Sequence, residues 1–416
     1  MSTEPMSILH LTTREDWQRD DPGPYTAPSL AAEGFIHCSL PAQVVHTAHR
    51  NYRDRDDLVL LHIDPSRLTA RLAYEDTSGH GVFPHVYGPI DRGAVTDIEP
   101  YRPTGKHDGR RFGVGWGLAG GVAIASIAEA RDVARWAGEV GFDSLWISQS
   151  NAVDPVVALA AIATDDSPLR EVGTSVVPLY GRHPLALAQA VRTAQSAWGG
   201  RFTLGVGASH RGPVEGSLGL SWDRPLGFTT EFLAGLMPLL EGRPADVDGE
   251  QLTVHGELAI DAASTPVLLA GLGPRMLDLA GRVAAGTTVG QCGPRTLRNH
   301  VVPRIREAAE AAGRPAPRVV ALIRICVTED VDTAKAQARE VGAFYSALPS
   351  YAAALAKEAL NEPADLHLIG SADRVLDGLA AYALAGATDL RIEVVAPDPD
   401  SREATREALA GWLATV

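Results

Sequence analysis

Residues 173–209 read GTSVVPLYGRHPLALAQAVRTAQSAWGGRFTLGVGAS, and this stretch decides the fold of most of the chain. Residues 172–177 form a β-branched run that a proline closes, and residues 202–206 form a second apolar run. Between them, residues 184–198 carry apolar side chains at helical spacing, with a proline just inside the expected helix start. Strand, helix and strand in so short a segment predict a βαβ unit, which requires a parallel sheet.

Two glycine-rich turns follow predicted strands of this sheet. Such a turn at the carboxyl end of a parallel strand lets the backbone approach a phosphate or a cofactor closely. In the second turn, a proline opens a helix whose first backbone N–H groups are free to bind an anion. We therefore predict that both turns hold a phosphorylated ring cofactor; the alternative is that the glycines only shape the turns. The predicted cofactor-binding residues are Gly207, Ala208 and Ser209 in the first turn and Gly271, Leu272, Gly273 and Pro274 in the second.

Composition argues against several classes of partner. The 416 residues carry a formal net charge of −14, which argues against broad binding of nucleic acid or anionic membranes. No apolar run approaches the length of a bilayer span, and the N-terminus lacks a basic flank with a hydrophobic core. The three cysteines are scattered, so we expect buried free thiols, no disulfide framework, no metal site and a cytoplasmic location. We expect a small-molecule substrate, and the oligomeric state is left open between a monomer and a homodimer.

A linker divides the sequence into two predicted domains. Residues 99–111 read EPYRPTGKHDGRR, which combines proline, glycine and charge without apolar periodicity. We therefore predict a compact domain over residues 1–103, a linker over residues 104–111 and a larger domain over residues 112–416.

The larger domain alternates strand and helix along its length. The pattern predicts about eight strands with intervening helices in roughly 300 residues, which matches a (β/α)8 barrel. A doubly wound open sheet is the alternative, because a count of strands does not prove closure. Residues 207–224 and 346–368 exceed the usual loop length, and long βα loops cover the active-site mouth of a barrel.

Several short motifs of this domain are shared with one family. They are Gly173–Pro178, Arg182–Pro184, Ala188-Gln189, Gly200–Phe202 and Leu204–Gly207, followed by Leu269–Leu277 and Ala280-Gly281. In this order and spacing, the chain from about Phe112 onward resembles the luciferase-like flavin and deazaflavin oxidoreductases, especially their coenzyme F420-dependent branch. The resemblance implies a closed barrel and hydride transfer to or from F420, with FMN as the alternative cofactor. It also implies a non-prolyl cis peptide between Ser175 and Val176, which forms a bulge behind the cofactor ring.

The candidate active site lies at the carboxyl ends of the predicted strands. The residues there are mostly small, hydroxyl or amide, which suits chemistry that a cofactor carries. Gln149 and Ser150 stand where the sugar-phosphate dehydrogenase branch of the family has an Asp-His pair. We therefore expect hydride transfer to or from an activated alkene, imine or carbonyl, assisted by Gln149 or a water. The predicted catalytic residues are Gln149, Ser150 and His210, and Ser175, Val176 and Gln291 join the cofactor-binding set.

The substrate is expected to be apolar or weakly polar. The segment 346–368 is rich in Ala and Leu and contains Tyr351, and no basic cluster is found at the predicted strand ends. Trp116 stands at the end of the first predicted strand, residues 112–117, and His183 opens the helix of the βαβ unit, so both are predicted to line the substrate pocket. For His183, a capping or packing role is the alternative.

The N-terminal domain carries two histidine-containing turns, GFIHCS at 34–39 and FPHVYGP at 83–89. Over about residues 7–100, the sequence resembles a small bacterial domain family of unknown function (DUF952). That family has been grouped with the ADP-ribosyltransferase fold, which implies an α+β domain with an NAD-type cleft. The alternative is that the histidines of the two turns are buried and fix them by hydrogen bonds. The residues of the predicted cleft are His10, His37, Glu75, His85 and Tyr87.

Three functions follow from these observations. The first is an F420-dependent oxidoreductase, which the signature stretch favours. The second is an FMN-dependent luciferase-like monooxygenase on the same barrel. The third is a non-catalytic cofactor-binding or sensory protein, which the absence of the Asp-His pair keeps open.

Overall fold

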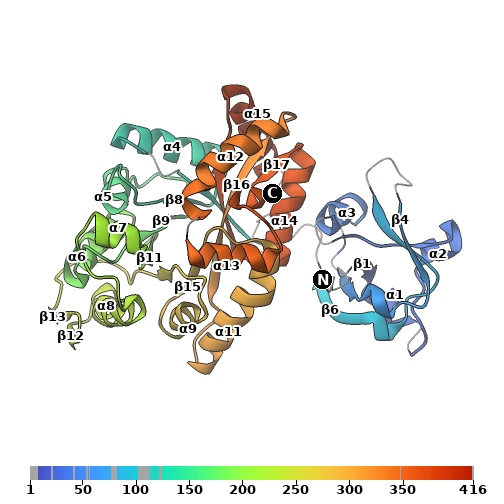
Figure 1. The fold of residues 1–416 in the computed structure, drawn as a ribbon, viewed down its shortest axis with the longest axis horizontal. Helices are drawn as coiled ribbons and strands as arrows, with labels where there is room; N and C mark the ends of the chain where they lie inside the picture. The colour runs from blue at the N-terminus through green and yellow to red at the C-terminus, as the bar shows by residue number, and fades with distance from the viewer. Residues whose placement is uncertain are drawn as a thin grey trace. The chain divides into compact units, whose positions relative to one another are not determined.

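The computed structural model describes residues 8–19, 22–40, 43–52, 55, 57–75, 82–101, 112, 114–120, 124–346 and 348–414. The chain divides into two compact units (Figure 1). One comprises residues 1–113 and 376–384, and the other comprises residues 114–375 and 385–416. The predicted linker, residues 104–111, lies outside the described residues.

Eight parallel strands in the described part of the larger unit close into a barrel (Figure 1). Neighbouring strands follow the order of the chain, β18 pairs with β7, and β9 pairs with β11, so the barrel has no free edge. The closed sheet confirms the predicted (β/α)8 barrel and excludes the open doubly wound sheet. The strands are β7 (Gly115–Ala119), β8 (Ser144–Ile147), β9 (Glu171–Thr174), β11 (Phe202–Gly207), β14 (Val267–Leu269), β15 (Gly286–Val289), β16 (Arg318–Val327) and β18 (Asp389–Val394).

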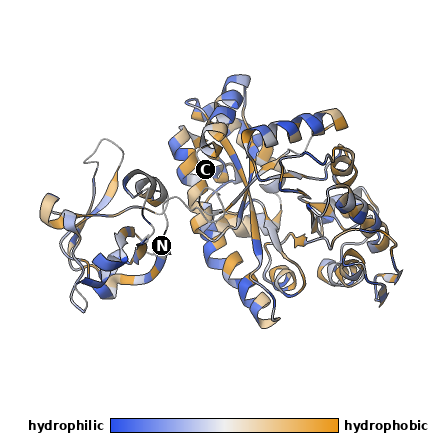
Figure 2. Cartoon of the chain, turned by 180° about the vertical axis from the view of Figure 1, so that it is seen from behind, coloured by the Kyte–Doolittle hydropathy of each residue, from blue (hydrophilic) through white to orange (hydrophobic). Residues whose placement is uncertain are grey.

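Helices follow the strands and form the outer layer of the barrel (Figure 1), and residues 376–384 of α14 are grouped with the N-terminal unit. Their starts carry signals that the sequence shows: Ser126 accepts a hydrogen bond from the Glu129 N–H, and Pro184 is the first residue of α6. Figure 2 shows hydrophilic and hydrophobic residues interspersed along them, as expected where one helix face packs on the barrel. They are α4 (Ile127–Val140), α5 (Pro155–Ala161), α6 (Pro184–Ala197), α7 (Arg211–Gly216), α8 (Pro225–Leu240), α9 (Pro274–Val283), α10 (Pro294–Thr296), α11 (Val302–Ala311), α12 (Val331–Ser346), α13 (Pro349–Glu358), α14 (Ala372–Leu384) and α15 (Pro399–Leu413).

Short strands supplement the barrel. A hairpin of β12 (Ala245–Asp248) and β13 (Thr253–Gly256) follows α8, and β17 (Leu368–Gly370) pairs with β16. The strand β10 (Val177–Pro178) continues the third barrel strand beyond a cis peptide bond between Ser175 and Val176. The cis bond that the family resemblance implied is therefore confirmed.

A tryptophan fills part of the barrel interior. The indole of Trp146 packs with Leu268 and Val320, and its Nε1 donates a hydrogen bond of 2.9 Å to Ser144 Oγ. A Cβ at Gly117 would lie 2.7 Å from Nε1 of that indole, so a larger residue there would collide with it. Because side chains alternate along a strand, Gly117 fixes which residues of β7 face the interior.

An ion-pair cluster joins three strands at their amino ends, opposite the candidate site. The guanidinium of Arg318 on β16 contacts Glu171 on β9 at 2.7 Å and Asp389 on β18 at 2.9 Å. The amino ends of the strands thus contribute to the stability of the barrel, and the candidate site lies at their carboxyl ends, as in other barrels of this type.

The N-terminal unit is an α+β structure. Its strands form two three-stranded sheets in the orders β1-β3-β6 and β2-β5-β4, with antiparallel pairing. A core that includes Tyr25, Ile36, Leu61 and Val86 holds its sheets and helices together. The elements are β1 (Ile8–Thr13), α1 (Arg14–Arg19), α2 (Pro28–Glu33), β2 (Ile36–His37), α3 (Val44–Asn51), β3 (Leu58–Ile63), β4 (Arg71–Glu75), β5 (Phe83–Tyr87) and β6 (Val95–Tyr101).

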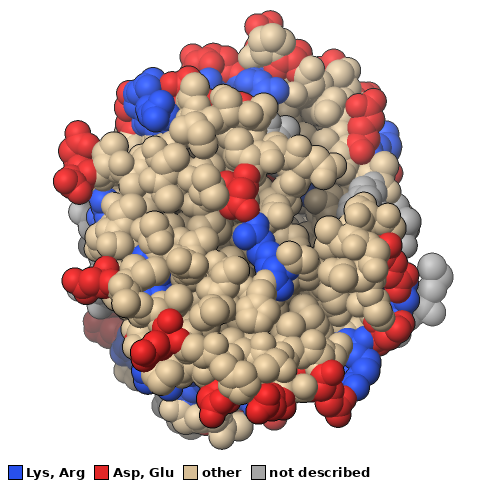
Figure 3. Space-filling model, turned by 90° about the vertical axis from the view of Figure 1, so that its left-hand side faces the viewer, with Lys and Arg blue, Asp and Glu red and all other residues tan. Residues whose placement is uncertain are grey.

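No disulfide bond joins the three cysteines. Cys38, Cys292 and Cys326 are buried free thiols, as predicted. Within the described residues, no helix is long and apolar enough to cross a membrane. On the face seen in Figure 3, acidic and basic side chains are interspersed, mostly toward the edge, and uncharged side chains cover most of the centre.

Candidate active site

A cavity of about 240 Å³ lies at the carboxyl ends of the barrel strands. Each of the eight strands, or the turn directly after it, contributes to the lining, and α12 and α13 add one tyrosine each. The site is therefore at the end of the barrel where the sequence placed it. Of the predicted site residues, the structure brings six together around this cavity: Gln149, Ser175, Val176, Ser209, His210 and Gln291.

Other predicted site residues do not line the cavity. Ser150 is exposed, and its neighbour Ser148 lines the cavity in its place. Ala270 lines the cavity at the second glycine turn, directly before the residues predicted there. The remaining positions outside the lining are Gly207, Ala208, Gly271, Leu272, Gly273 and Pro274 in the turns, together with Trp116 and His183.

Trp116 lies on the outer face of its strand. The sequence placed this strand at 112–117, whereas β7 spans Gly115–Ala119. Gly117 faces Trp146 inside the barrel and Ala119 lines the cavity, so the alternation of side chains turns Trp116 away from both. Trp116 is buried there, and Ala119 takes the place at the strand end that Trp116 was predicted to hold.

His183 has the capping position that the sequence left as its alternative. It is the N-cap of α6, and its Nδ1 accepts a hydrogen bond of 3.3 Å from the Leu185 N–H. Its Nε2 lies 3.0 Å from the carbonyl oxygen of Thr253 in the β12–β13 hairpin. Both ring nitrogens are thus engaged away from the cavity.

The first glycine turn supports the cavity wall from behind. A Cβ at Gly207 would lie 3.2 Å from Cγ2 of Val176 and 3.3 Å from Cβ of Ala270, and both of these residues line the cavity. Ser209 has a φ of +60°, a left-handed conformation that turns its side chain into the lining. Gly207 therefore acts by close packing, and Ser209 is the residue of this turn that reaches the cavity.

The side chain of Gln149 is held in one orientation. Nη2 of Arg182 donates a hydrogen bond of 2.8 Å to Oε1 of Gln149 and also pairs with Asp154. Because a guanidinium only donates, the Gln149 oxygen must face it, which leaves the amide N–H groups as donors. Burial raises the pKa of Asp154, but the hydrogen bonds from Arg182 and from the first turn of α5 outweigh it and hold the pKa below its usual range. The motif contained Arg182, but its role depends on a contact that the sequence does not show.

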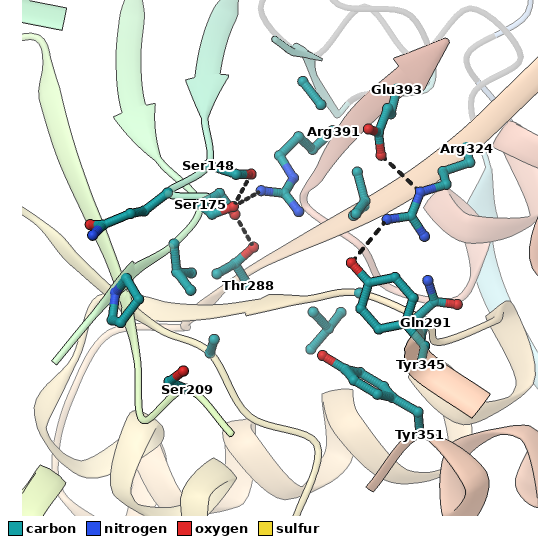
Figure 4. A pocket seen from close by; sticks show the side chains of 18 of the residues that line it. Ser148, Ser175, Ser209, Thr288, Gln291, Arg324, Tyr345, Tyr351, Arg391 and Glu393 are labelled. Atoms are coloured by element: carbon teal, nitrogen blue, oxygen red, sulfur yellow. Dashed lines mark hydrogen bonds and ion pairs between the residues drawn. The ribbon is translucent and has the colours of Figure 1, made fainter. Parts of the chain in front are cut away.

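The carbonyl oxygen of Ser175 anchors the floor of the cavity (Figure 4). It accepts hydrogen bonds from Oγ of Ser148 at 2.5 Å and from Nη1 of Arg391 at 2.7 Å. The Ser175 hydroxyl lies 3.0 Å from Oγ1 of Thr288 on β15. Three neighbouring segments of the barrel thereby hold the bulge at Ser175–Val176 in place.

Two arginines line the cavity, contrary to the expectation that no basic groups gather there. Arg324 on β16 pairs with Glu393 at 2.8 Å and lies 3.5 Å from the Tyr345 hydroxyl, and Arg391 stands on the adjacent strand β18 (Figure 4). Arg324 interrupts the apolar run LIRICV, and Arg391 stands in DLRIEV, where charged and apolar residues alternate. A charged residue inside an apolar run was the signal that could have found Arg324.

Gln291 presents an unbonded amide. It has a φ of +53°, is only 5% exposed, and neither its Oε1 nor its Nε2 has a hydrogen-bond partner. A buried amide left without partners costs free energy, so a water or a ligand that bonds to it would stabilise the structure. Its place in the lining matches a ring ligand that offers both a donor and an acceptor at its edge.

Aromatic side chains close the opposite side of the cavity. The His210 ring lies 5.7 Å from the ring of Tyr351 on α13, which in turn lies 5.2 Å from that of Tyr345 on α12. Burial lowers the pKa of His210, so the imidazole is neutral at pH 7. The segment 346–368 thus reaches the barrel mouth as predicted, through Tyr351.

A second cavity, of about 600 Å³, lies within the N-terminal unit. Three residues of the predicted cleft, His10, His37 and His85, line it, while Glu75 and Tyr87 do not. Instead, the Tyr87 hydroxyl donates a hydrogen bond of 2.5 Å to Glu75.

Hydrogen bonds tie His10 to the turn that contains His37. Its Nδ1 lies 2.7 Å from the carbonyl oxygen of His37, and its Nε2 lies 3.0 Å from the Tyr25 hydroxyl. Burial lowers the pKa of His10 to about 4, so its ring is neutral at pH 7. His10 therefore fixes a turn, which is the structural role that the sequence proposed as the alternative for its neighbours His37 and His85.

A closed (β/α)8 barrel with a cis peptide bond after its third strand and a cavity at the strand ends matches the architecture that the resemblance to the luciferase-like class implied. Residues 111–389, more than half of the chain, match the family described as luciferase-like monooxygenase, and the chain belongs to this family. Residues 11–98 match a second family, described as a protein of unknown function (DUF952).

Named relatives support this assignment. The chain is 30% identical over 206 residues to a 5,10-methylenetetrahydromethanopterin reductase of Methanolobus tindarius, covering 49% of this chain and 62% of that protein. It is 30% identical over 226 residues to an F420-dependent glucose-6-phosphate dehydrogenase of Nakamurella multipartita, covering 50% and 66%. The chain thus spans somewhat less than two thirds of either relative. Among solved structures, the coenzyme F420-dependent tetrahydromethanopterin reductase of Methanopyrus kandleri has the same fold, with a TM-score of 0.57, 22% identity and coverage of 71% and 97%.

Proposed function

We propose that the barrel transfers hydride between coenzyme F420 and a small organic substrate. The observation that carries this proposal is the buried, unbonded amide of Gln291 in the same cavity as the Ser175–Val176 bulge. Names of relatives add support, since the dehydrogenase of Nakamurella multipartita is F420-dependent. The lining itself offers amides, hydroxyls and a few charged groups, which suits chemistry that a bound cofactor supplies.

Three groups of residues would hold the cofactor. The bulge at Ser175–Val176 would support one face of the ring, and the Gln291 amide would hydrogen-bond to the ring edge. Ser209, at the first glycine turn, would donate its hydroxyl to a phosphate oxygen. When bound, F420 supplies a carbon centre that accepts or releases hydride, a two-electron step without oxygen activation.

Gln149 would orient the substrate. Its amide N–H groups remain available because Arg182 occupies its oxygen. A hydrogen bond from this amide to a carbonyl or imine would stabilise the negative charge that develops when hydride arrives. The aromatic wall of His210, Tyr345 and Tyr351 would exclude water from the reacting atoms.

Separate titrations with F420, FMN and NADPH test the proposal. Intrinsic fluorescence or calorimetry should report F420 binding at micromolar Kd or tighter, which corresponds to about −8 kcal/mol. Gln291→Leu should weaken F420 at least tenfold, because the buried amide is lost. Gln189→Leu is the matched control, since Gln189 is exposed on α6 outside the cavity, and it should leave the affinity unchanged.

Each rival function has its own outcome. Tight FMN binding with oxygen consumption and no F420 binding would replace the proposal by a monooxygenase. F420 binding with no hydride transfer to any substrate tried would favour a cofactor-binding or sensory protein.

A further inference from the structure

The charges that line the cavity do not balance. Its charged residues are Arg324, Arg391 and Glu393, and Glu393 already pairs with Arg324 at 2.8 Å. Arg182, just behind Gln149, is paired with Asp154. Among the described residues, no carboxylate forms an ion pair with Arg391. One positive charge in the cavity is therefore left over.

This charge is deeply buried. Arg391 is 5% exposed, and burial lowers its pKa to about 10, so the guanidinium remains protonated at pH 7. Glu393 attracts this charge but is already paired with Arg324, and a buried ion without a carboxylate of its own is unfavourable unless a binding partner compensates it. Its neighbours Leu390 and Ile392 are fully buried, and in the parallel register it lies beside Gly117 and Leu322. The side chain reaches the cavity at the carbonyl oxygen of Ser175, beside the bulge.

The Nε of the guanidinium, which has no partner, indicates the chemistry of a ligand. Nη1 of Arg391 is bound to the carbonyl oxygen of Ser175, whereas Nε has no partner. Nε and Nη2 form the edge that binds a carboxylate with two parallel hydrogen bonds. In the same barrel, Arg318 binds Asp389 in this way, with its Nε and Nη2 at 3.2 and 2.9 Å.

We propose that the substrate carries a carboxylate, which Arg391 binds at the floor of the cavity. This inference rests on the proposed hydride transfer and replaces the apolar substrate that the sequence suggested. The carboxylate neutralises the excess charge and fixes the distance between the reacting carbon and the Ser175–Val176 bulge. Arg391 is in this view a specificity-determining residue.

Butyrate and its uncharged isostere butyramide are suitable probes. In calorimetry on the F420-loaded protein, butyrate should bind at least tenfold more tightly than butyramide, which corresponds to about 1.4 kcal/mol. Arg391→Met should abolish this preference. Because Nη1 of Arg391 also holds the Ser175 carbonyl oxygen, the F420 affinity of this variant is measured separately. Arg135→Met, at an exposed arginine on α4, is the matched control and should preserve the preference for butyrate over butyramide.

The results separate this inference from the proposed function. Equal binding of butyrate and butyramide to the unmodified protein overturns the inference, even if Arg391→Met fails to fold. A variant that loses F420 but keeps its butyrate preference overturns it as well, because Arg391 then serves the cofactor. Tighter binding of inorganic phosphate than of butyrate would assign the floor to a different anion. Butyrate preference without any F420 binding would refute the proposed cofactor and leave the carboxylate site intact.

Discussion

Replacing Arg182 by methionine tests whether Gln149 acts as a held donor. Methionine keeps much of the length and apolar volume of the side chain but cannot hydrogen-bond to Oε1 of Gln149 or pair with Asp154. Asp154 keeps its hydrogen bonds from the Val156 and Val157 N–H groups, so α5 retains its cap. The change therefore releases the amide while leaving the local fold in place.

The size of the expected fall in kcat follows from the hydrogen bond between Arg182 and Gln149 that the variant loses. A hydrogen bond from a charged donor contributes about 1.5–3 kcal/mol, which favours one amide orientation by more than tenfold. Without Arg182, both orientations become comparable in energy and the side chain gains rotamers. We expect kcat to fall about three- to tenfold, which corresponds to about 0.7–1.4 kcal/mol in the barrier. The Arg182–Asp154 pair is partly exposed, so stability should fall by less than about 1 kcal/mol.

Oxidation of reduced F420, followed by absorbance with a carbonyl or imine substrate, measures this effect. The F420 Kd should stay unchanged, and Gln149→Leu should lower kcat by more than Arg182→Met does. In the double variant, Arg182→Met should add nothing to Gln149→Leu, because both act through one amide. Additive losses, or an unchanged kcat in Arg182→Met, would refute the reasoning.

Three further predictions concern other parts of the chain. Gly207→Val should push against Val176 and Ala270 and weaken F420 at least tenfold, about 1.4 kcal/mol, in a folded protein; unchanged affinity would make Gly207 a turn residue only. A protein that begins at Arg110 should fold and bind F420, as measured by circular dichroism and titration, and aggregation that only residues 1–103 relieve would contradict two independent domains. Because burial lowers the pKa of His10 to about 4, the unfolded state binds more protons below the ordinary value of about 6.5. Stability of the N-terminal unit should therefore be complete above that value and fall by at most about 3 kcal/mol toward pH 4; thermal melts of His10→Gln should lack this slope.

Local sequence patterns were sufficient for the architecture of this protein. The βαβ unit at 173–209 and the alternation that follows it predicted a parallel barrel, and the closed sheet confirms it. Helix starts at Pro155, Pro184 and Pro274 are readable because proline fits the first turn of a helix. These features depend on residues that are near one another in the chain, so the sequence alone predicts them.

The direction in which side chains point was harder to predict from the sequence. A shift of the first strand from 112–117 to Gly115–Ala119 changes which residue stands at its end, so Ala119 rather than Trp116 lines the cavity. Since the side-chain period of a strand is two residues, small errors in its bounds reassign its faces. The same holds for the second glycine turn, where Ala270 reaches the lining directly before the predicted residues.

Patterns in the sequence were enough to predict the barrel, the end that carries the candidate site, the bulge at Ser175–Val176 and the family. Only the tertiary structure decided that Arg182 holds Gln149 and that Arg391 supports Ser175 from 216 residues away along the chain. It also decided that Arg324, and not Arg391, pairs with Glu393. The physical reason is that secondary structure follows from short-range periodicity, whereas the charge balance of a buried cavity is set by which distant strands the closed barrel brings side by side.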